Sequence, residues 1–252
     1  MIELQNLTKR YGKFTAVDEI SLEVPRGELY GLLGPNGAGK TTTMRMIAGI
    51  LRPTSGRVLI AGIDIGADPI GAKRRLGFIP DRPFVYDKLT GAEFLRFVAG
   101  LFGQEGPGLN RRIDELLGLF ELLSWRNELT ESYSHGMRQK LIIASALLHR
   151  PDVIVVDEPM VGLDPKSARL LKDLLREFVR RGGTVLMSTH TLEIAEAMCD
   201  RIAIVHSGRI VADGSMEQLR AQTASGDASL EDLFLKLTGG LSDRELSELF
   251  DS

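Results

Sequence analysis

The stretch that decides the fold is Leu29-Tyr-Gly-Leu-Leu33, which runs directly into Gly34-Pro-Asn-Gly-Ala-Gly-Lys-Thr41. The first five residues form a continuous apolar run, which predicts a buried strand. The next eight match the pattern G-x-x-x-x-G-K-[ST], and Lys40–Ile50 has the pattern of a helix. Glycines let such a loop curl so that several backbone N–H groups and the helix N-terminus face one anion. The stretch therefore predicts an α/β fold with a phosphate-binding loop at the end of a strand.

The polar residues of this loop have predicted tasks at a nucleotide. The Lys40 ammonium supplies a point charge for the β- and γ-phosphates, the Thr41 hydroxyl is a ligand for Mg2+, and Thr42 can donate to the α-phosphate. The alternative is a chance glycine-rich turn, but the flanking strand and helix favour the nucleotide. The residues that we expect to contact it here are Gly34, Pro35, Asn36, Gly37, Ala38, Gly39, Lys40, Thr41 and Thr42.

A second apolar run ends in two carboxylates. Val153–Val156 predicts a buried strand, and Asp157 and Glu158 follow it directly. Ligands of open parallel sheets bind at the carboxyl ends of the strands. If this strand and Leu29–Leu33 lie near each other, Asp157 faces the Mg2+ that Thr41 binds, and Glu158 can polarise the attacking water. A strand that ends in Asp-Glu is common, so the prediction of a hydrolase depends on the phosphate loop.

Around these two runs, strands and helices alternate on both sides of a helical segment, residues 87–149. Short buried strands that alternate with helices imply a mostly parallel sheet covered on both faces. The predicted strands are 2–7, Ser21–Val24, Arg57–Ile60, Thr184–Ser188 and the hairpin of Arg201–Val205 with Arg209–Ala212. The predicted helices are Glu93–Leu101, Arg112–Phe120, Gly136–His149, Pro165–Arg181 and Thr191–Met198.

Composition excludes several classes of protein. The 252 residues include 31 Lys and Arg against 34 Asp and Glu, and the net charge of −3 argues against a protein that coats DNA or RNA. No run of about 18 apolar residues is available to span a membrane, and the N-terminus lacks the apolar segment of a signal peptide. Cys199 is the one cysteine, so no intrachain disulfide is expected, a reducing cytosol is favoured, and we interpret the thiol as part of the core.

A third motif, Tyr133-Ser-His-Gly-Met137, opens the helix before Val153–Val156. Ser134 can cap this helix and leave its first N–H groups free for an anion. Together with the phosphate loop and the Asp157-Glu158 pair, the motif resembles the ATP-binding cassette (ABC) family, whose signature here is usually Leu-Ser-Gly-Gly-Gln. The resemblance implies a P-loop NTPase fold with a mostly parallel sheet, an N-terminal antiparallel part and an inserted helical subdomain.

The same resemblance implies a division of the chain. It covers roughly residues 1–236, with an α/β core at 1–85 and 150–218 and a helical subdomain at 86–149. Residues 237–252 form a C-terminal tail, in which Ser242-Asp-Arg-Glu245 is a possible capping box before a short amphipathic helix. We expect that helix to be docked or frayed, with a regulatory or partner-binding role as the alternative.

In the family, two cassettes enclose two ATP molecules head to tail. By resemblance, Ser134 and Gly136 contact the γ-phosphate held by the phosphate loop of the other cassette, and Val161-Gly-Leu-Asp164-Pro165 crosses to that partner. His135 and Met137 depart from the family's Gly and Gln. Asp164 is also expected to cap the helix that begins at Pro165.

Three more residues have roles implied by the resemblance. Tyr11 resembles the aromatic residue that stacks on adenine, and His190 matches the switch histidine that contacts the γ-phosphate. Asp81 stands where the family usually has Gln, and its carboxylate can bind Mg2+ or hold water near the γ-phosphate. The catalytic set is therefore Lys40, Glu158 and His190, and the metal ligands are Thr41, Asp157 and Asp81.

The resemblance implies the ATP-hydrolysing subunit of a transporter, with ATP and Mg2+ as cofactors and a separate membrane permease as partner. Its place would be the cytoplasmic face of the membrane, as a peripheral protein in a cassette dimer, with a homodimer expected. The segment Arg82–Glu93 would receive the permease, and we expect its Phe84, Val85 and Tyr86 to be exposed. Ser229–Thr238 is similar to C-termini of subunits paired with exporter-type permeases, which suggests export.

Three other functions stay open from the sequence. A soluble ABC ATPase could act on ribosomes or DNA ends, although relatives of that kind carry two cassettes or a long coiled coil and no nucleic-acid partner is expected here. The departures from the family pattern at Asp81, His135 and Met137 allow a regulator that switches without useful hydrolysis. The presence of Lys40 and Glu158 argues against that function. A P-loop kinase would have no use for the motif at 133–137.

Overall fold

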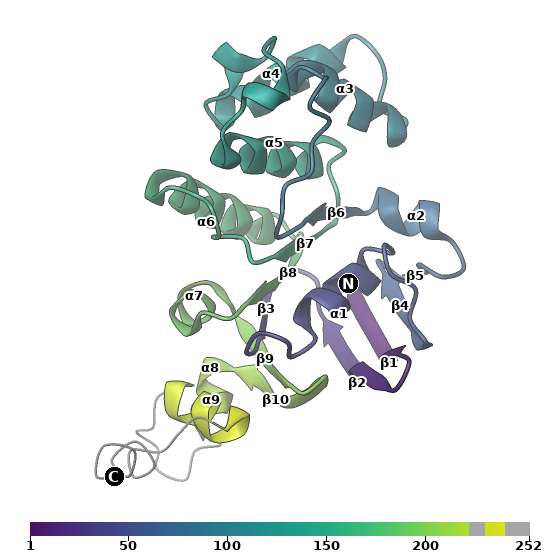
Figure 1. Ribbon diagram of the computed structural model, residues 1–252, viewed down its shortest axis with the longest axis vertical. Coiled ribbons are helices and arrows are strands. Elements are labelled where there is room, and N and C mark those ends of the chain that lie inside the picture. The colour runs from purple at the N-terminus through teal and green to yellow at the C-terminus, as the bar shows by residue number, and fades with distance from the viewer. Residues whose placement is uncertain (222–229, 240–252) are drawn as a thin grey trace.

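The computed structural model describes residues 1–221 and 230–239, and its centre is a six-stranded sheet in the order β10-β9-β3-β8-β7-β6 (Figure 1). Every neighbouring pair is parallel except β9 and β10, which form the predicted hairpin. The sheet is therefore mostly parallel, as expected. Its strands are β3 (Leu29–Leu33), β6 (Leu76–Ile79), β7 (Val153–Asp157), β8 (Thr184–Thr189), β9 (Arg201–His206) and β10 (Arg209–Ser215).

The strand order decides where the two apolar runs meet. β3 and β7 are not neighbours, because β8 pairs with both of them. In the pairing, Leu33 of β3 lies opposite Thr189 of β8, and Asp157 of β7 lies opposite Ser188. The carboxyl ends of the three strands are thus level at one edge of the sheet, where the phosphate loop also begins.

A second sheet of four strands packs beside the first and is antiparallel, in the order β2-β1-β4-β5. Helix α1 lies between the two sheets, and its Met44, Met46 and Ile47 share one buried cluster with residues of both (Figure 1). This packing fixes the start of α1 against the central sheet. The bounds are β1 (Ile2–Tyr11), β2 (Phe14–Val24), β4 (Ser55–Ile60), β5 (Ile63–Asp64) and α1 (Lys40–Ile47).

The opposite face of the central sheet packs against helices. Alternate residues of the strands, such as Leu29 and Leu33 in β3, join one buried cluster with these helices, while Tyr30 and Leu32 join the other cluster. The helices α3, α4 and α5 gather at one end of the molecule (Figure 1). The helices are α2 (Pro69–Arg74), α3 (Gly91–Leu101), α4 (Gly108–Leu119), α5 (His135–Leu148), α6 (Pro165–Arg180), α7 (Leu192–Met198), α8 (Met216–Ala221) and α9 (Leu230–Thr238).

Most predicted elements are confirmed within a few residues, and several short ones were missed. Helix α1 ends at Ile47 and not at Ile50, because Gly49 has a left-handed φ of 62°. The missed elements are α2, α8, α9, β5 and β6, of which all but α9 have six residues or fewer and show no clear period. Strand β2 begins at Phe14, seven residues before the predicted start at Ser21. Cys199 is buried, as expected. The Ser242–Glu245 capping box lies outside the described residues.

One expectation of exposure is wrong. Phe84 and Tyr86 are exposed, with relative accessibilities of 73% and 48%, but Val85 is only 6% exposed. Its side chain joins the buried cluster of the helical end of the molecule, which also holds Phe94 and Leu95 of α3. Of the three neighbouring apolar residues, the outer two are therefore exposed and the middle one packs into the core.

Candidate functional site

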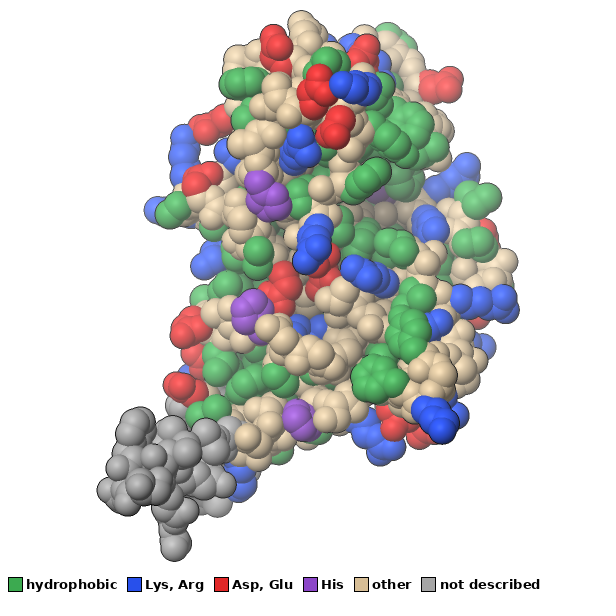
Figure 2. Space-filling model, viewed as in Figure 1, with side chains coloured by type: hydrophobic (Ala, Val, Ile, Leu, Met, Phe, Trp, Pro, Cys, Tyr) green, Lys and Arg blue, Asp and Glu red, His purple; other side chains and the backbone are tan. Residues whose placement is uncertain are grey.

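A cleft of about 420 Å³ opens at the carboxyl edge of the central sheet. Acidic and basic side chains and a histidine gather in the middle of the face shown in Figure 2, between the helices above and the strands below. Sequence reasoning placed most of the lining in one site, and the structure brings those residues together. The cleft is lined by Tyr11, Phe14, Ala16, Asn36, Gly37, Gly39, Lys40, Thr41, Thr42, Asp81, Glu158 and His190.

The loop between β3 and α1 takes its shape from glycine. Gly39 precedes the first residue of α1 and has a φ of 105°, which side chains rarely allow. A Cβ there would also lie 2.5 Å from the backbone oxygen of Ala16. The loop can therefore pack this closely against β2 only with glycine at this position.

Lys40 is the buried cation of the site. Its side chain is 6% exposed, and Nζ donates to the backbone oxygens of Gly34 at 2.7 Å and Pro35 at 3.1 Å. Burial lowers the pKa of Lys40, while the charges of Glu158 and Asp157 act in the opposite direction. The ammonium thus ties both ends of the loop together. Three predicted loop residues lie beneath the cleft lining and support the loop from there: Gly34, Pro35 and the buried Ala38.

Asp157 lies beneath the cleft and is almost fully buried. Ser188 of β8 donates its hydroxyl to one carboxylate oxygen, and the Thr41 hydroxyl is hydrogen-bonded to the same carboxyl group. Burial raises the pKa of Asp157, and the hydrogen bonds from Ser188 and Thr41 oppose that rise. Thr41 and Asp157 are therefore adjacent, as the two separate sequence runs predicted.

Glu158 connects the other polar residues. Its Oε1 lies 3.0 Å from Nδ1 of His190 and 3.9 Å from Nζ of Lys40. Its backbone has a φ of 50°, an uncommon value for glutamate, and its N–H donates to Oγ of Ser188 at 3.1 Å. Such strain persists where the surrounding structure fixes it and is common at functional sites. Here it turns the carboxylate from the end of β7 toward His190.

The remaining predicted residues of this site line its rim. Asp81 follows β6 and lies close enough to Asp157 for its charge to raise the pKa of that carboxyl group. Tyr11 ends β1 and lies opposite Phe14, which begins β2. Both aromatic rings are exposed, with relative accessibilities of 49% and 64%. The cleft thus has charges at its base and two flat apolar side chains at its rim.

Three predicted binding residues lie elsewhere. Ser134 caps α5 and accepts from the N–H of Met137 at 3.3 Å, and Asp164 caps α6 and accepts from the N–H of Ser167 at 3.0 Å. Neither residue lines the cleft, and neither does Gly136. The two helix starts are close to each other, because a Cβ on Gly136 would lie 3.5 Å from the oxygen of Gly162. These residues form a second surface that is separate from the phosphate loop in the same chain.

The residues of the cleft suit Mg2+ bound together with phosphates. In the described part of the chain, no three His, Cys, Asp or Glu side chains gather as a metal site. Mg2+ is usually held by one or two carboxylates together with substrate phosphates and water, so a full protein cage is not needed. The adjacent hydroxyl of Thr41 and buried carboxylate of Asp157 are the oxygen donors of that kind here.

Besides Ala16 of the cleft lining, sequence reasoning missed two residues of the site, Ser188 and Phe14. Ser188 bridges Asp157 and the backbone of Glu158 from the middle strand, and Phe14 lies beside Tyr11 on the neighbouring strand at the cleft rim. A signal existed for both. Ser188 is a hydroxyl in an apolar strand two residues before His190, and Phe14 is an aromatic residue at the turn that follows Tyr11. Without the strand order, neither had a partner to which it could be assigned.

Comparisons with known proteins agree with this geometry. The family described as ABC transporter matches residues 17–161, more than half of the chain. The Bacillus subtilis (strain 168) ABC transporter ATP-binding protein NatA is 36% identical over 96% of this chain and 100% of its own length. The Streptomyces peucetius daunorubicin/doxorubicin resistance ATP-binding protein DrrA is 40% identical over 89% of this chain and 68% of its own.

A longer relative covers the chain as well. The probable multidrug ABC transporter ATP-binding protein YbhF of Escherichia coli (strain K12) is 38% identical over 94% of this chain, which spans only 41% of that protein. In the described residues, no helix combines the length and apolar character needed to cross a membrane.

Solved structures have the same fold. The structure of an ATP binding subunit of an ABC transporter superposes with a TM-score of 0.88 at 34% identity, covering 94% of this chain and 99% of that one. A dimeric post-hydrolysis structure of the ATP-binding cassette MJ0796, bound to ADP and Pi, gives 0.78 at 27% identity, over 85% of this chain and 98% of that one. With its phosphate loop, its acidic pair and this similarity, the chain belongs to the ABC transporter family as an ATP-binding cassette.

Proposed function

We propose that this chain hydrolyses ATP to drive transport, in the direction of export, through a separate membrane permease. The observation that carries the proposal is the convergence of Lys40, Asp157, Glu158 and His190 at one edge of the sheet. One buried cation, one buried carboxylate and one carboxylate paired with histidine are the parts that phosphoryl transfer to water requires. The similarity to cassettes of transporters supports the rest.

In the proposed mechanism, the N–H groups of the loop at 34–41 bind the phosphates, and Lys40 leaves the Gly34 and Pro35 carbonyls for the β- and γ-phosphates. Thr41 and Asp157 would hold Mg2+, with Asp81 beside them, and the metal supplies charge neutralisation on the phosphates. Glu158 Oε accepts a proton from the attacking water, while His190 holds that carboxylate and contacts the γ-phosphate.

The adenine would lie against the rim. Tyr11 supplies an exposed ring at the mouth of the cleft, and Phe14 lies beside it on the next strand. Stacking on an aromatic ring depends on the face of the base and not on hydrogen bonds, so a modest preference among purines is expected. Thr42 and Asn36 line the same cleft.

A second cassette would complete the site. Ser134, Gly136 and Asp164 belong to the exposed surface of α5 and α6 and do not reach the cleft of their own chain. In a head-to-tail dimer, the N-terminus of α5 would face the γ-phosphate of the partner, and Ser134 would add a hydroxyl. The dimeric MJ0796 cassette bound to ADP and Pi supports this arrangement, for which we propose two copies of this chain.

The permease would dock on the helical end of the molecule, at the cytoplasmic face of the membrane. Apolar side chains gather there over α3 (Figure 2). Tyr86 packs edge-on against Phe84 at 5.7 Å and Phe97 at 5.3 Å between ring centroids, and both partners are exposed. Exposed apolar clusters of this kind mark interaction sites.

We also divide the chain into a core at 1–85 and 150–218, a helical part at 86–149 and a tail at 237–252.

The names of relatives support export. They include a daunorubicin/doxorubicin resistance ATP-binding protein and a Nod factor export ATP-binding protein of Ralstonia nicotianae, which is 37% identical over 88% of this chain. This chain has the same kind of ATP-binding cassette as these relatives. The transported molecule would contact the permease.

Affinity capture tests the whole proposal. We expect the Glu158→Gln variant, with ATP and Mg2+, to enrich a multi-spanning membrane protein from detergent-solubilised membranes, because it binds ATP without completing hydrolysis. Lys40→Ala is the control that lacks the nucleotide-bound state. Enrichment of only ribosomal or nucleoid proteins, measured by mass spectrometry, would contradict the role in transport and leave the ATPase chemistry standing.

Ser188→Ala tests the bridge between the two carboxylates. We expect kcat for ATP hydrolysis to fall about tenfold, because the variant loses a hydrogen bond to the buried Asp157 and the acceptor of the Glu158 N–H. Phosphate release measures kcat, and ATP titration measures KM, which we expect to change little. The matched control is Ser145→Ala, which removes a buried hydroxyl that donates to the oxygen of Ile142 in α5, away from the cleft. An equal loss of activity in both variants would contradict the bridging role.

A further inference from the structure

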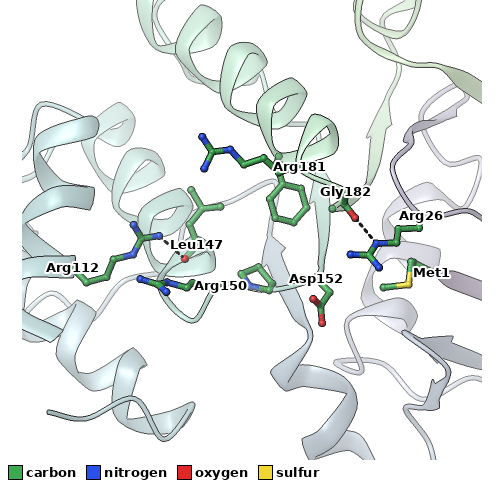
Figure 3. A pocket seen from close by; sticks show the side chains of 11 residues that line it. Met1, Arg26, Arg112, Leu147, Arg150, Asp152, Arg181 and Gly182 are labelled. Atoms are coloured by element: carbon green, nitrogen blue, oxygen red, sulfur yellow. Dashed lines mark hydrogen bonds between the residues drawn. The ribbon is translucent and has the colours of Figure 1, made fainter. Parts of the chain in front are cut away.

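A second pocket lies at the opposite edge of the central sheet, and the ATPase mechanism does not use it (Figure 3). Its volume is about 520 Å³. Arg26 lies ahead of β3, Pro151 and Asp152 ahead of β7, and Gly182 ahead of β8, whereas the residues of the nucleotide cleft follow these strands. A strand of five residues spans roughly 17 Å, so this pocket and the nucleotide cleft lie at opposite ends of the strands, about that far apart.

We call this site the arginine pocket because four arginines line it: Arg26, Arg112, Arg150 and Arg181. In Figure 3, Arg112 and Arg150 lie together on one side, and Arg26 lies on the other side, next to Met1. The lining includes one carboxylate, Asp152, which pairs with Arg75 at 2.9 Å. Positive charge therefore exceeds negative charge in the pocket.

The arginines differ in how their charge is balanced. Arg181 pairs with Glu177 at 2.7 Å, and Arg112 lies 3.9 Å from Glu115. Across the described residues, no ion pair includes Arg26 or Arg150. Two guanidinium groups at the pocket thus lack a carboxylate partner.

Arg112 supplies a second, independent observation. It donates one Nη to the oxygen of Leu147 at 3.3 Å, but its buried Nε has no hydrogen-bond partner among the described residues. Burial and the nearby charge of Arg150 both lower the pKa of Arg112. A buried donor without a partner costs free energy, and so does the approach of two like charges. An anion between Arg112 and Arg150 would relieve both costs.

The rest of the lining determines what kind of anion fits. Guanidinium groups match the oxygens of phosphates and carboxylates, and the excess of positive charge over the whole pocket is balanced better by a dianion than by a monoanion, which favours a phosphate monoester. Leu147, Phe178 and Pro151 supply an apolar wall beside the charges. The volume lies within the range of pockets that hold small organic ligands.

We propose that the arginine pocket binds a small organic phosphate, with the phosphate group between Arg112 and Arg150 and the apolar body against Leu147, Phe178 and Pro151. The site is separate from Lys40 and the nucleotide cleft, so it does not depend on the proposed function. It lies between the end of α5 and the end of α6, and a bound ligand would join the helical part of the molecule to the central sheet.

Calorimetric titration with phenyl phosphate tests the proposal on the full chain. Saturating ADP and Mg2+ are present throughout, so that the nucleotide cleft is already filled. We expect saturable binding that weakens at least about tenfold in Arg150→Asn, because a charge-assisted hydrogen bond is lost. Asparagine suits the position, since Arg150 has a φ of 55°. Within residues 1–221 and 230–239, the side chain of Arg150 makes no hydrogen bond that the substitution would remove, and its backbone bond to Leu147 is kept, whereas Arg112→Gln would also lose the bond from Arg112 Nη to the oxygen of Leu147.

Arg111→Asn is the matched control. Arg111 precedes Arg112 on α4, pairs with Glu115 at 3.0 Å and does not line the pocket. The absence of saturable binding by the unmodified chain, or an equal loss in Arg111→Asn, would overturn the proposal. Inorganic phosphate that binds as tightly as phenyl phosphate would overturn the role of the apolar wall.

A binding experiment with lipid vesicles decides whether the phosphate monoester belongs to a lipid or to a free metabolite. Vesicles of phosphatidylcholine with phosphatidic acid present the same group on a lipid. If the unmodified chain sediments with these vesicles and the Arg150→Asn variant does not, the result supports the site and identifies a lipid headgroup as its ligand. Binding of phenyl phosphate without sedimentation would support it with a free metabolite as the ligand.

Discussion

Glu158→Gln is expected to lower the rate of ATP hydrolysis by about 10²-fold to 10⁴-fold, the range for loss of a general base. Glutamine has nearly the size of glutamate but carries no charge, so it cannot take the proton of the attacking water. In the structure, this carboxylate lies 3.0 Å from His190 Nδ1 and 3.9 Å from Lys40 Nζ, at the mouth of the phosphate loop. Phosphate release from the purified chain measures the effect.

Binding should survive this change. The loop N–H groups, Lys40 and Thr41 remain, so ATP affinity is expected to stay within about threefold of the original value, and removal of a negative charge near the phosphates acts in favour of binding. Glu193→Gln is the control, because Glu193 is exposed on α7, three residues after His190, and does not line the cleft. Ordinary turnover by Glu158→Gln would contradict the role assigned to Glu158.

Lys40→Ala is expected to abolish measurable hydrolysis and to weaken ATP binding by about tenfold to a hundredfold, the effect of losing hydrogen bonds to a charged group. Lys40 is nearly buried and donates to the oxygens of Gly34 and Pro35. Alanine therefore removes both the charge for the phosphates and the tie that holds the loop closed. Equilibrium binding of a fluorescent ATP analogue measures the affinity.

The control separates loss of local charge from a general change of surface charge. Lys73→Ala removes an exposed lysine of α2, outside the nucleotide cleft, and should leave binding and hydrolysis unchanged. Thermal unfolding shows whether the Lys40 variant is still folded. A folded Lys40→Ala chain that binds ATP with its original affinity would show that the loop does not use this cation for the phosphates.

The contrast between Glu158 and Ser188 shows how far the sequence could lead. The pattern of an apolar run followed by Asp157 and Glu158 predicted a buried strand with carboxylates at its end, and this is confirmed. The bridge from Ser188 was not predictable, because it depends on β8 lying between β3 and β7. Strand order is set by packing over the whole chain, which a local pattern does not contain.

Val85 illustrates the same limit on a smaller scale. Apolar character alone suggested an exposed row of three residues, but the middle side chain packs against distant residues of the core. A local sequence pattern predicts reliably where the backbone conformation at a position requires one residue type, as the φ of 105° requires glycine at Gly39. Such patterns are less reliable where neighbours far along the chain decide whether a side chain is covered.

The sequence by itself determined the phosphate loop, the helix caps at Ser134 and Asp164 and the alternation of buried strands with helices, because each of these depends on contiguous residues. Only the tertiary structure decided that Glu158 reaches His190, that Ser188 joins the two carboxylates, and that four arginines surround a pocket at the far edge of the sheet. Those groups come from segments far apart in the chain, and the burial of the central sheet brings them together.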